Sequence, residues 1–202
     1  MRARLALDVS ELACELREIT LRDKPLAMLR VSPKGTVPVL VDAAGVVIEE
    51  SLDIMLWALR LRDPELWLTP ERGTLEAVLA LIHRFDAEFK PLLDRYKYPD
   101  RFEGADAEAS RHAASLWLLT LDERLQDARY LFGERAGLAD MALAPFVRQF
   151  ANVDAAWFAS RSWTHLQAWL TAIVDSARFA RIMRPIAVWQ AGSPGVPLPL
   201  VP

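Results

Sequence analysis

The feature that most constrains the fold of this chain is a change of hydrophobic pattern after residue 62. Before that point, the short β-branched runs Val37–Val41 and Val46–Ile48 are joined by a glycine-containing connection, which is typical of a β-hairpin. From Leu75 onward, apolar residues recur only at helical spacing. We therefore expect an α/β domain over residues 1–62, a linker with two prolines over 63–72, and an all-α domain over 73–202.

In the first domain, helices and strands are predicted to alternate along the sequence. The pattern indicates, in order, a helix over 5–12, a strand over 15–21, a short helix over 25–30, the hairpin, and a helix over 51–61. The last part of the chain, from Pro185, holds five prolines and two glycines. We expect this tail to be extended, and either packed on the surface or mobile.

Composition excludes several classes of protein. The 24 basic and 27 acidic residues are interspersed and give a net charge of −3, so we expect no nucleic-acid or membrane partner. Apolar stretches are interrupted by charges too often for a membrane-spanning helix, and no apolar signal segment opens the chain. A single cysteine excludes an internal disulfide framework. The three histidines, His83, His112 and His165, are far apart in sequence, and none has a partner at metal-ligand spacing. These features predict a cytoplasmic protein without a metal.

One stretch of the first domain carries groups suited to binding a peptide-like ligand. If the bond before Pro38 is cis, the backbone N–H and C=O of Val37 turn outward and are free to pair with an extended ligand. Ser51 begins a helix whose N-terminus favours a carboxylate, and Glu50 suits an ammonium. Lys24 suits a second carboxylate. Glutathione carries this set of charges and amides.

Each of these residues also has a simpler interpretation. Pro38 alone is compatible with the start of an edge strand, Glu50 with a solvated acid, and Ser51 with an ordinary helix cap. Lys34, four residues before Pro38, is expected to be solvated. We favour the ligand interpretation because all the groups occur together.

The same residues resemble the N-terminal domain of cytosolic glutathione transferases, nearest to the omega-like or bacterial cysteine-type branch. The resemblance rests on Lys24-Pro25, on the run from Ser32 to Leu40, and on the run from Glu50 to Ile54. Lys24 and Val37 are thirteen residues apart, as are Val37 and Glu50, which matches the spacing of that branch. The resemblance covers nearly the whole chain and implies a thioredoxin-like domain followed by an all-helical one.

The resemblance also implies roles for these residues. Val37, beside a cis Pro38, would pair with the cysteinyl part of glutathione, Glu50 and Ser51 would hold the γ-glutamyl head, and Lys24 would hold the glycyl carboxylate. The family is usually homodimeric, with the helices that begin near Ser51 and near Thr74 at the interface.

Features of the second domain agree with this family. Gly137 and Asp140 resemble the family's N-capping box, which concerns folding rather than chemistry; the family prefers Ser or Thr in place of this glycine. Tyr96 and Tyr98, at the end of the first long helix, are weaker candidates for lining a substrate pocket.

The family's first strand and catalytic turn have no counterpart in this sequence. In the cysteine-type branch a Cys-Pro-Phe/Tyr-Ala turn precedes the helix that here starts at Met1, so no catalytic residue can be assigned. A cysteine in that turn would have its thiolate stabilised by the helix dipole. We expect Met1 to be an internal methionine, with roughly 12–20 residues upstream, since a strand averages about five or six residues and a turn must follow; the competing interpretation is a truncated paralogue. Cys14 is expected at the C-terminal end of the first helix, as a core residue rather than a replacement nucleophile.

Three hypotheses for function follow. The first is a glutathione-dependent transferase or thiol reductase that acts on a small electrophile or a mixed disulfide, with its nucleophile upstream. The second is a non-catalytic member of the fold that binds glutathione or a protein. The third is a structural or dimerisation module that uses only the helical domain.

Overall fold

The computed structural model describes residues 1–199 and divides into two compact units. One unit contains residues 1–65 together with the segment that starts at Ser176, and the other is Leu66–Asp175. From the sequence we expected the helical domain to continue to residue 202. The structure instead groups the segment after Asp175 with the N-terminal part of the chain.

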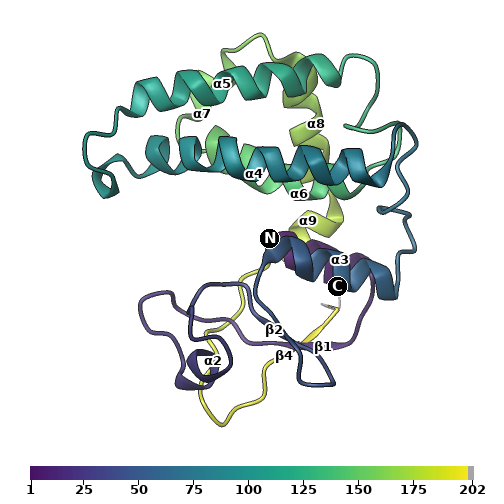
Figure 1. Ribbon diagram of the computed structural model, residues 1–202, viewed down its shortest axis with the longest axis vertical. Helices are drawn as coiled ribbons and strands as arrows, with labels where there is room; N and C mark the ends of the chain where they lie inside the picture. The colour runs from purple at the N-terminus through teal and green to yellow at the C-terminus, as the bar shows by residue number, and fades with distance from the viewer. Residues whose placement is uncertain (200–202) are drawn as a thin grey trace. The chain divides into compact units, whose positions relative to one another are not determined.

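The first unit consists of short strands and helices, and its core lies between α1 and α3 (Figure 1). The two helices pack through apolar side chains that are almost fully buried, including Leu5, Ala6, Met55 and Ala58. The elements are α1 (Arg2–Val9), β1 (Cys14–Leu16), α2 (Leu26–Val31), β2 (Leu40–Val41), β3 (Val47–Ile48), α3 (Ser51–Leu61), α9 (Ala177–Ile182) and β4 (Val196–Leu198).

The predicted hairpin is present and is shorter than its sequence pattern suggested. β2 and β3 pair antiparallel, with Leu40 opposite Ile48 and Val41 opposite Val47. The connection turns through Asp42, whose carboxylate accepts hydrogen bonds from the backbone N–H groups of Ala44 and Val46 at 2.9 and 2.8 Å. Such a turn fixes the register of the hairpin.

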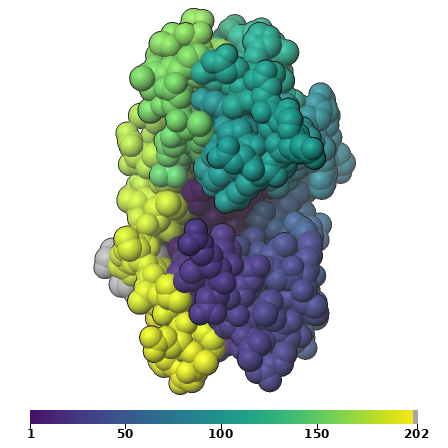
Figure 2. All heavy atoms as spheres, turned by 90° about the vertical axis from the view of Figure 1, so that its left-hand side faces the viewer, coloured from purple at the N-terminus to yellow at the C-terminus, as the bar shows by residue number. Residues whose placement is uncertain are grey.

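The tail after α9 is extended, as expected, and it forms a strand that the sequence did not reveal. β4 pairs antiparallel with β1, and the backbone N–H of Trp189 donates to the carbonyl of Glu18 at 2.8 Å. In the space-filling view this yellow segment lies against the purple start of the chain (Figure 2). Gly195 permits the close approach, because a Cβ there would lie 2.7 Å from the Leu16 carbonyl oxygen.

A buried carboxylate ties α9 to α1. Asp8 of α1 has a side chain only 4% exposed, and it accepts hydrogen bonds from Arg178 and Arg181 of α9. The Asp8–Arg181 contact is bidentate, with both N–O distances at 2.7 Å. Arg178 also bridges to Glu65. Since a buried charge is costly without partners, this network explains why α9 belongs to the first unit.

The second unit is all-helical, as the periodicity predicted. Its longest helices, α4 and α5, pack together, and α6 packs against α4 (Figure 1). The predicted apolar stripe of α4 is the buried face of that helix, with Phe85 and Phe89 stacked at 4.3 Å between ring centroids. The elements are α4 (Leu75–Lys97), a 3₁₀ turn η1 (Pro99–Arg101), α5 (Ala107–Arg124), α6 (Leu138–Ala151), α7 (Ala155–Ala159) and α8 (Thr164–Val174).

Cys14 does not lie at the end of the first helix, where the sequence analysis placed it. α1 stops at Val9, and Cys14 lies half-buried on β1, where burial raises the pKa of its thiol.

Among the helices of residues 1–199, none is long and apolar enough to cross a membrane.

Candidate functional site

The site begins at the turn that leads into the hairpin. Gly35 is buried and has a φ of +63°, a backbone conformation that residues with a side chain adopt only with strain. The ammonium of Lys24 lies against this turn, with Nζ 3.6 Å from the position that a Cβ on Gly35 would take. The positive φ therefore favours glycine at this turn, and Lys24 lies within ordinary contact distance of it.

The Val37–Pro38 peptide bond is cis. Val37 is 46% exposed, and its backbone forms no hydrogen bond to another residue of the 1–199 range. Pro38 follows before the paired part of the hairpin starts at Leu40. This segment thus presents a free backbone donor and acceptor at the surface of the first unit.

The hairpin connects the Val37–Pro38 segment to the start of α3. Its register pairs Leu40 with Ile48, so Pro38 and Glu50 each lie two residues beyond this pair along the chain. Glu50 is exposed and immediately precedes α3. The contact between Glu50 and Lys34 brings the start of α3 close to the turn that precedes the hairpin.

Two acidic residues precede α3, and both have partners. Glu49 accepts a hydrogen bond from the buried hydroxyl of Ser32, with 2.5 Å between the oxygens. Glu50 forms an ion pair with Lys34, which stands next to Gly35 in the turn. This pair raises the pKa of Lys34 through the hydrogen bond to Glu50. We expected Lys34 to be only solvated, and no local signal marks a pair sixteen residues apart.

Ser51 is the first residue of α3, and the start of this helix is available to an anion. No side chain caps the helix, whose first backbone N–H groups have no intrahelical partner. These N–H groups, the Ser51 hydroxyl and the helix dipole all favour a carboxylate.

Taken together, these residues form a row of complementary charges on the first unit. Lys24 and Lys34 flank Gly35, Glu50 contacts Lys34, and Ser51 follows Glu50. A peptide-like ligand with a carboxylate at each end and an ammonium at one end matches this row. Of the five predicted ligand residues, Lys24 lies against the turn at Gly35, and Val37 and Pro38 follow this turn in sequence. Glu50 contacts Lys34 of the same turn and directly precedes Ser51. Their joint role in binding stays a prediction.

The N-terminus of α1 provides no nucleophile within the part of the chain that the structure describes. Met1 is the N-cap, and Arg2, Ala3 and Arg4 follow, so no thiol or hydroxyl lies in this turn. Across residues 1–199, no group of three or more His, Cys, Asp or Glu side chains is arranged to hold a metal ion.

Tyr96 and Tyr98 differ in their surroundings. Tyr96 is 8% exposed, packs on Phe150 at 5.1 Å between ring centroids, and its hydroxyl has no partner among the described residues. Tyr98 is partly exposed after α4, with the guanidinium of Arg101 4.1 Å from its ring centroid. Neither lines the two hollows described below, and their role in a substrate pocket stays a prediction.

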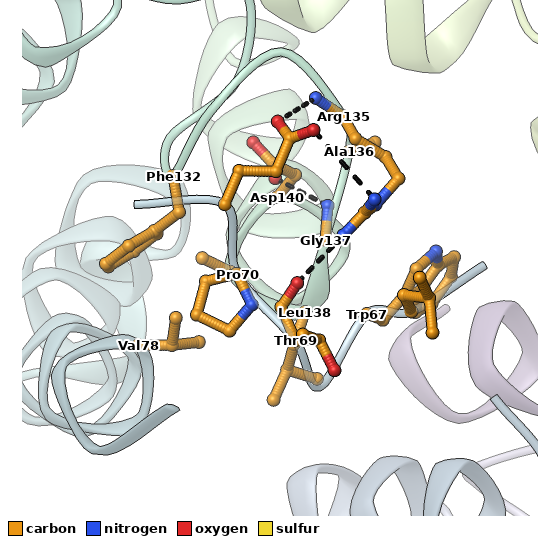
Figure 3. A pocket seen from close by; sticks show the side chains of 13 residues that line it. Trp67, Thr69, Pro70, Val78, Phe132, Arg135, Ala136, Gly137, Leu138 and Asp140 are labelled. Carbon is orange, nitrogen blue, oxygen red and sulfur yellow. Dashed lines mark hydrogen bonds and ion pairs between the residues drawn. The ribbon is translucent and has the colours of Figure 1, made fainter. Parts of the chain in front are cut away.

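The expected capping interaction at the start of α6 is present. The carboxylate of Asp140 accepts a hydrogen bond from the backbone N–H of Gly137 at 2.8 Å (Figure 3). It also accepts one from the backbone N–H of Leu131 at 2.9 Å. The indole Nε1 of Trp169 donates to the same carboxylate at 2.8 Å. Burial raises the pKa of Asp140, and the three N–H donors oppose this shift. A cavity of about 10 Å³ beside it has room for roughly one water molecule, and its position indicates packing rather than catalysis.

A wider hollow lies on the outer face of α3, within the first unit. Its volume is about 440 Å³, and its lining combines four apolar residues with one acidic and one basic residue. The lining residues are Ile48, Asp53, Leu56, Trp57, Arg60 and Leu61. Leu61 is 61% exposed, so this helix face is apolar and uncovered.

Two features of the fold can be compared with known families. They are a small α/β domain with a cis-proline beside a hairpin, and an all-helical second domain. The family profile of the glutathione S-transferase N-terminal domain matches residues 1–65, and that of the C-terminal domain matches residues 85–177. No curated protein sequence matches the chain significantly.

Several solved structures share this fold. A glutathione S-transferase from Rhodospirillum rubrum F11 is 21% identical, with a TM-score of 0.73 over 92% of this chain and 87% of that one. A glutathione transferase family member from Pseudomonas fluorescens Pf-5, solved with two glutathione molecules bound, is 18% identical, with a TM-score of 0.77 over 90% and 86%. Poplar glutathione transferase F1 is 17% identical, with a TM-score of 0.75 over 90% and 89%. The chain belongs to the glutathione transferase superfamily, with a thioredoxin-like N-terminal domain and an all-helical C-terminal domain.

Proposed function

We propose that this protein binds glutathione through Lys24, Val37, Pro38, Glu50 and Ser51. The observation that carries this proposal is the row of charges around Gly35 and the start of α3, next to the unpaired backbone of Val37. In this proposal Lys24 binds the glycyl carboxylate, Val37 pairs with the cysteinyl amide, and Ser51 with Glu50 holds the γ-glutamyl head. The Pseudomonas relative, which contains glutathione, supports the choice of ligand.

The reaction that we propose is glutathione conjugation or glutathione-dependent thiol exchange, of the cysteine-type branch. In conjugation, the glutathione thiolate attacks an electrophilic carbon, and the leaving group departs with its electron pair. In exchange, a cysteine thiolate attacks the glutathionyl sulfur of a mixed disulfide and releases the substrate thiol. A second glutathione thiolate then frees the cysteine as glutathione disulfide forms.

For the nucleophile, we propose a cysteine in a turn upstream of Met1. The first turn of α1 contains no thiol or hydroxyl, and a thiolate placed there would gain from the helix dipole. Intact mass of the protein from its native host tests this. We expect roughly 1.5–2.3 kDa more than the 22.7 kDa of this sequence, about the mass of a strand and a turn. A mass equal to that of the sequence would favour the alternative, a non-catalytic binding or protein-interaction module.

We further propose a homodimer in the cytoplasm, with α3 and the start of α4 in the interface. The uncovered apolar face of α3 supports this, because exposed apolar patches of this kind mark protein interfaces.

Retention on glutathione-agarose tests ligand binding. We expect retention of the purified protein, elution by free glutathione, and loss of retention for Glu50→Gln with Ser51→Ala. A matched control is Glu103→Gln, which neutralises an exposed acid of the other unit. Lack of retention of the wild type would leave only the structural or dimerisation role.

Turnover separates the enzyme from the binding module. The chain extended upstream should convert a chloronitrobenzene or hydroxyethyl disulfide substrate in a glutathione-dependent manner. Retention without any turnover would overturn the enzymatic proposal.

A further inference from the structure

The ion pair between Lys34 and Glu50 occupies a position that the proposed function assigns to the ligand. Glu50 is the acid proposed to receive the α-ammonium of the γ-glutamyl head, yet in this structure its carboxylate already contacts a cation of the same chain. The neighbouring Glu49 accepts a hydrogen bond from the Ser32 hydroxyl instead. The site therefore contains an internal counterpart of the ligand's ammonium.

The Lys34 side chain can stay beside Glu50 or move away when a ligand binds there. Its side chain is 52% exposed, and that of Glu50 is 64% exposed, so neither is held by packing. Exposed pairs of this kind contribute little stability, so a ligand can compete with the lysine at small cost. A lysine also has a flexible stem that allows its ammonium to shift without backbone movement.

We infer that Lys34 is a specificity-determining residue that stands in for the ligand's α-ammonium. The site then accepts γ-acyl peptides whose amino group is absent or blocked, as well as glutathione. Without Lys34, a bare Glu50 would repel the carboxylate of a ligand that brings no cation of its own. This inference rests on the proposed function and identifies which part of the head group the site requires.

Isothermal titration with two peptides tests the inference. The probes are glutathione and glutaryl-cysteinylglycine, which differ only in the α-amino group, and the measured quantity is the ratio of their dissociation constants. We expect the wild type to bind the two within about fivefold, and Lys34→Met to raise the preference for glutathione by a further factor of about three to five, the range that one exposed charge pair supplies.

Two matched variants complete the experiment. Lys34→Arg restores the cation and should return the ratio to that of the wild type. Lys24→Met, on the other side of Gly35, should weaken both peptides equally and leave the ratio unchanged. A ratio that Lys34→Met leaves within twofold of the wild type, or lowers, would overturn the inference. If the wild type binds neither peptide, the proposed function itself fails, which is a distinct result.

Discussion

Asp140 is a buried acid in the first turn of α6. Its carboxylate is buried and satisfies two backbone N–H groups and one indole N–H. Asp140→Ala leaves all three donors unsatisfied. We expect a loss of about 3 kcal/mol or more in the free energy of unfolding, because each buried unpaired donor costs roughly 1–3 kcal/mol. Urea denaturation measures this loss, and Asp127→Ala, an exposed acid of the same unit, should cost less than about 0.5 kcal/mol.

Cys14 provides a test that depends on pH. Burial raises the pKa of its thiol, so the reactive thiolate is scarcer at neutral pH than in an unfolded chain. We expect the alkylation rate with iodoacetamide to be lower in the folded protein and to reach half of its maximum at a higher pH. The control is the same protein in urea. Fast alkylation of the native protein at pH 7 would contradict the assignment of Cys14 as an unreactive structural residue.

At the scale of elements, Gly195 decides whether the tail can pair with β1. An added Cβ would lie 2.6 Å from the Glu15 Cγ and 2.7 Å from the Leu16 carbonyl oxygen, which is backbone and cannot move freely. We expect Gly195→Ala to speed amide hydrogen exchange in β1 by roughly tenfold, since such crowding costs about 1–3 kcal/mol. Ala191→Ser, an exposed change in the same tail, should leave that exchange unchanged. Unaltered exchange in Gly195→Ala would show that β4 does not protect β1.

The elements also show where sequence patterns are informative. The helix over Ser51–Leu61 has the predicted bounds, and the long helix begins at Leu75, where the helical spacing starts, because their apolar stripes are long and regular. The strand β4 could not be predicted, since its residues include prolines and its partner is about 180 positions away. The ion pair of Lys34 was missed for a similar reason: only the turn and the hairpin bring it to Glu50.

At the scale of the whole molecule, the uncovered face of α3 predicts the state of association. Leu61→Glu places a charge on the hollow of that helix, so a dimer formed through this face should dissociate at least about tenfold more readily. Light scattering measures the molar mass across a concentration series. Leu116→Glu is the matched control, because Leu116 on α5 is 58% exposed and Leu61 is 61% exposed. A dimer that tolerates Leu61→Glu, or a wild type that is monomeric, would contradict the proposed interface.

The cis bond before Pro38 and the residues proposed to bind glutathione were expected partly from the resemblance to the family. The sequence by itself determined the order of most helices and the hairpin. These features depend on local periodicity and on residue types at short spacing, which a single sequence displays directly. Only the tertiary structure decided that the segment after Asp175 joins the first unit, through a buried carboxylate and two arginines about 170 positions away. It also decided that the tail pairs with β1 and that Lys34 neutralises Glu50. Contacts between distant residues arise from chain topology and charge pairing, and neither leaves a periodic trace in the sequence.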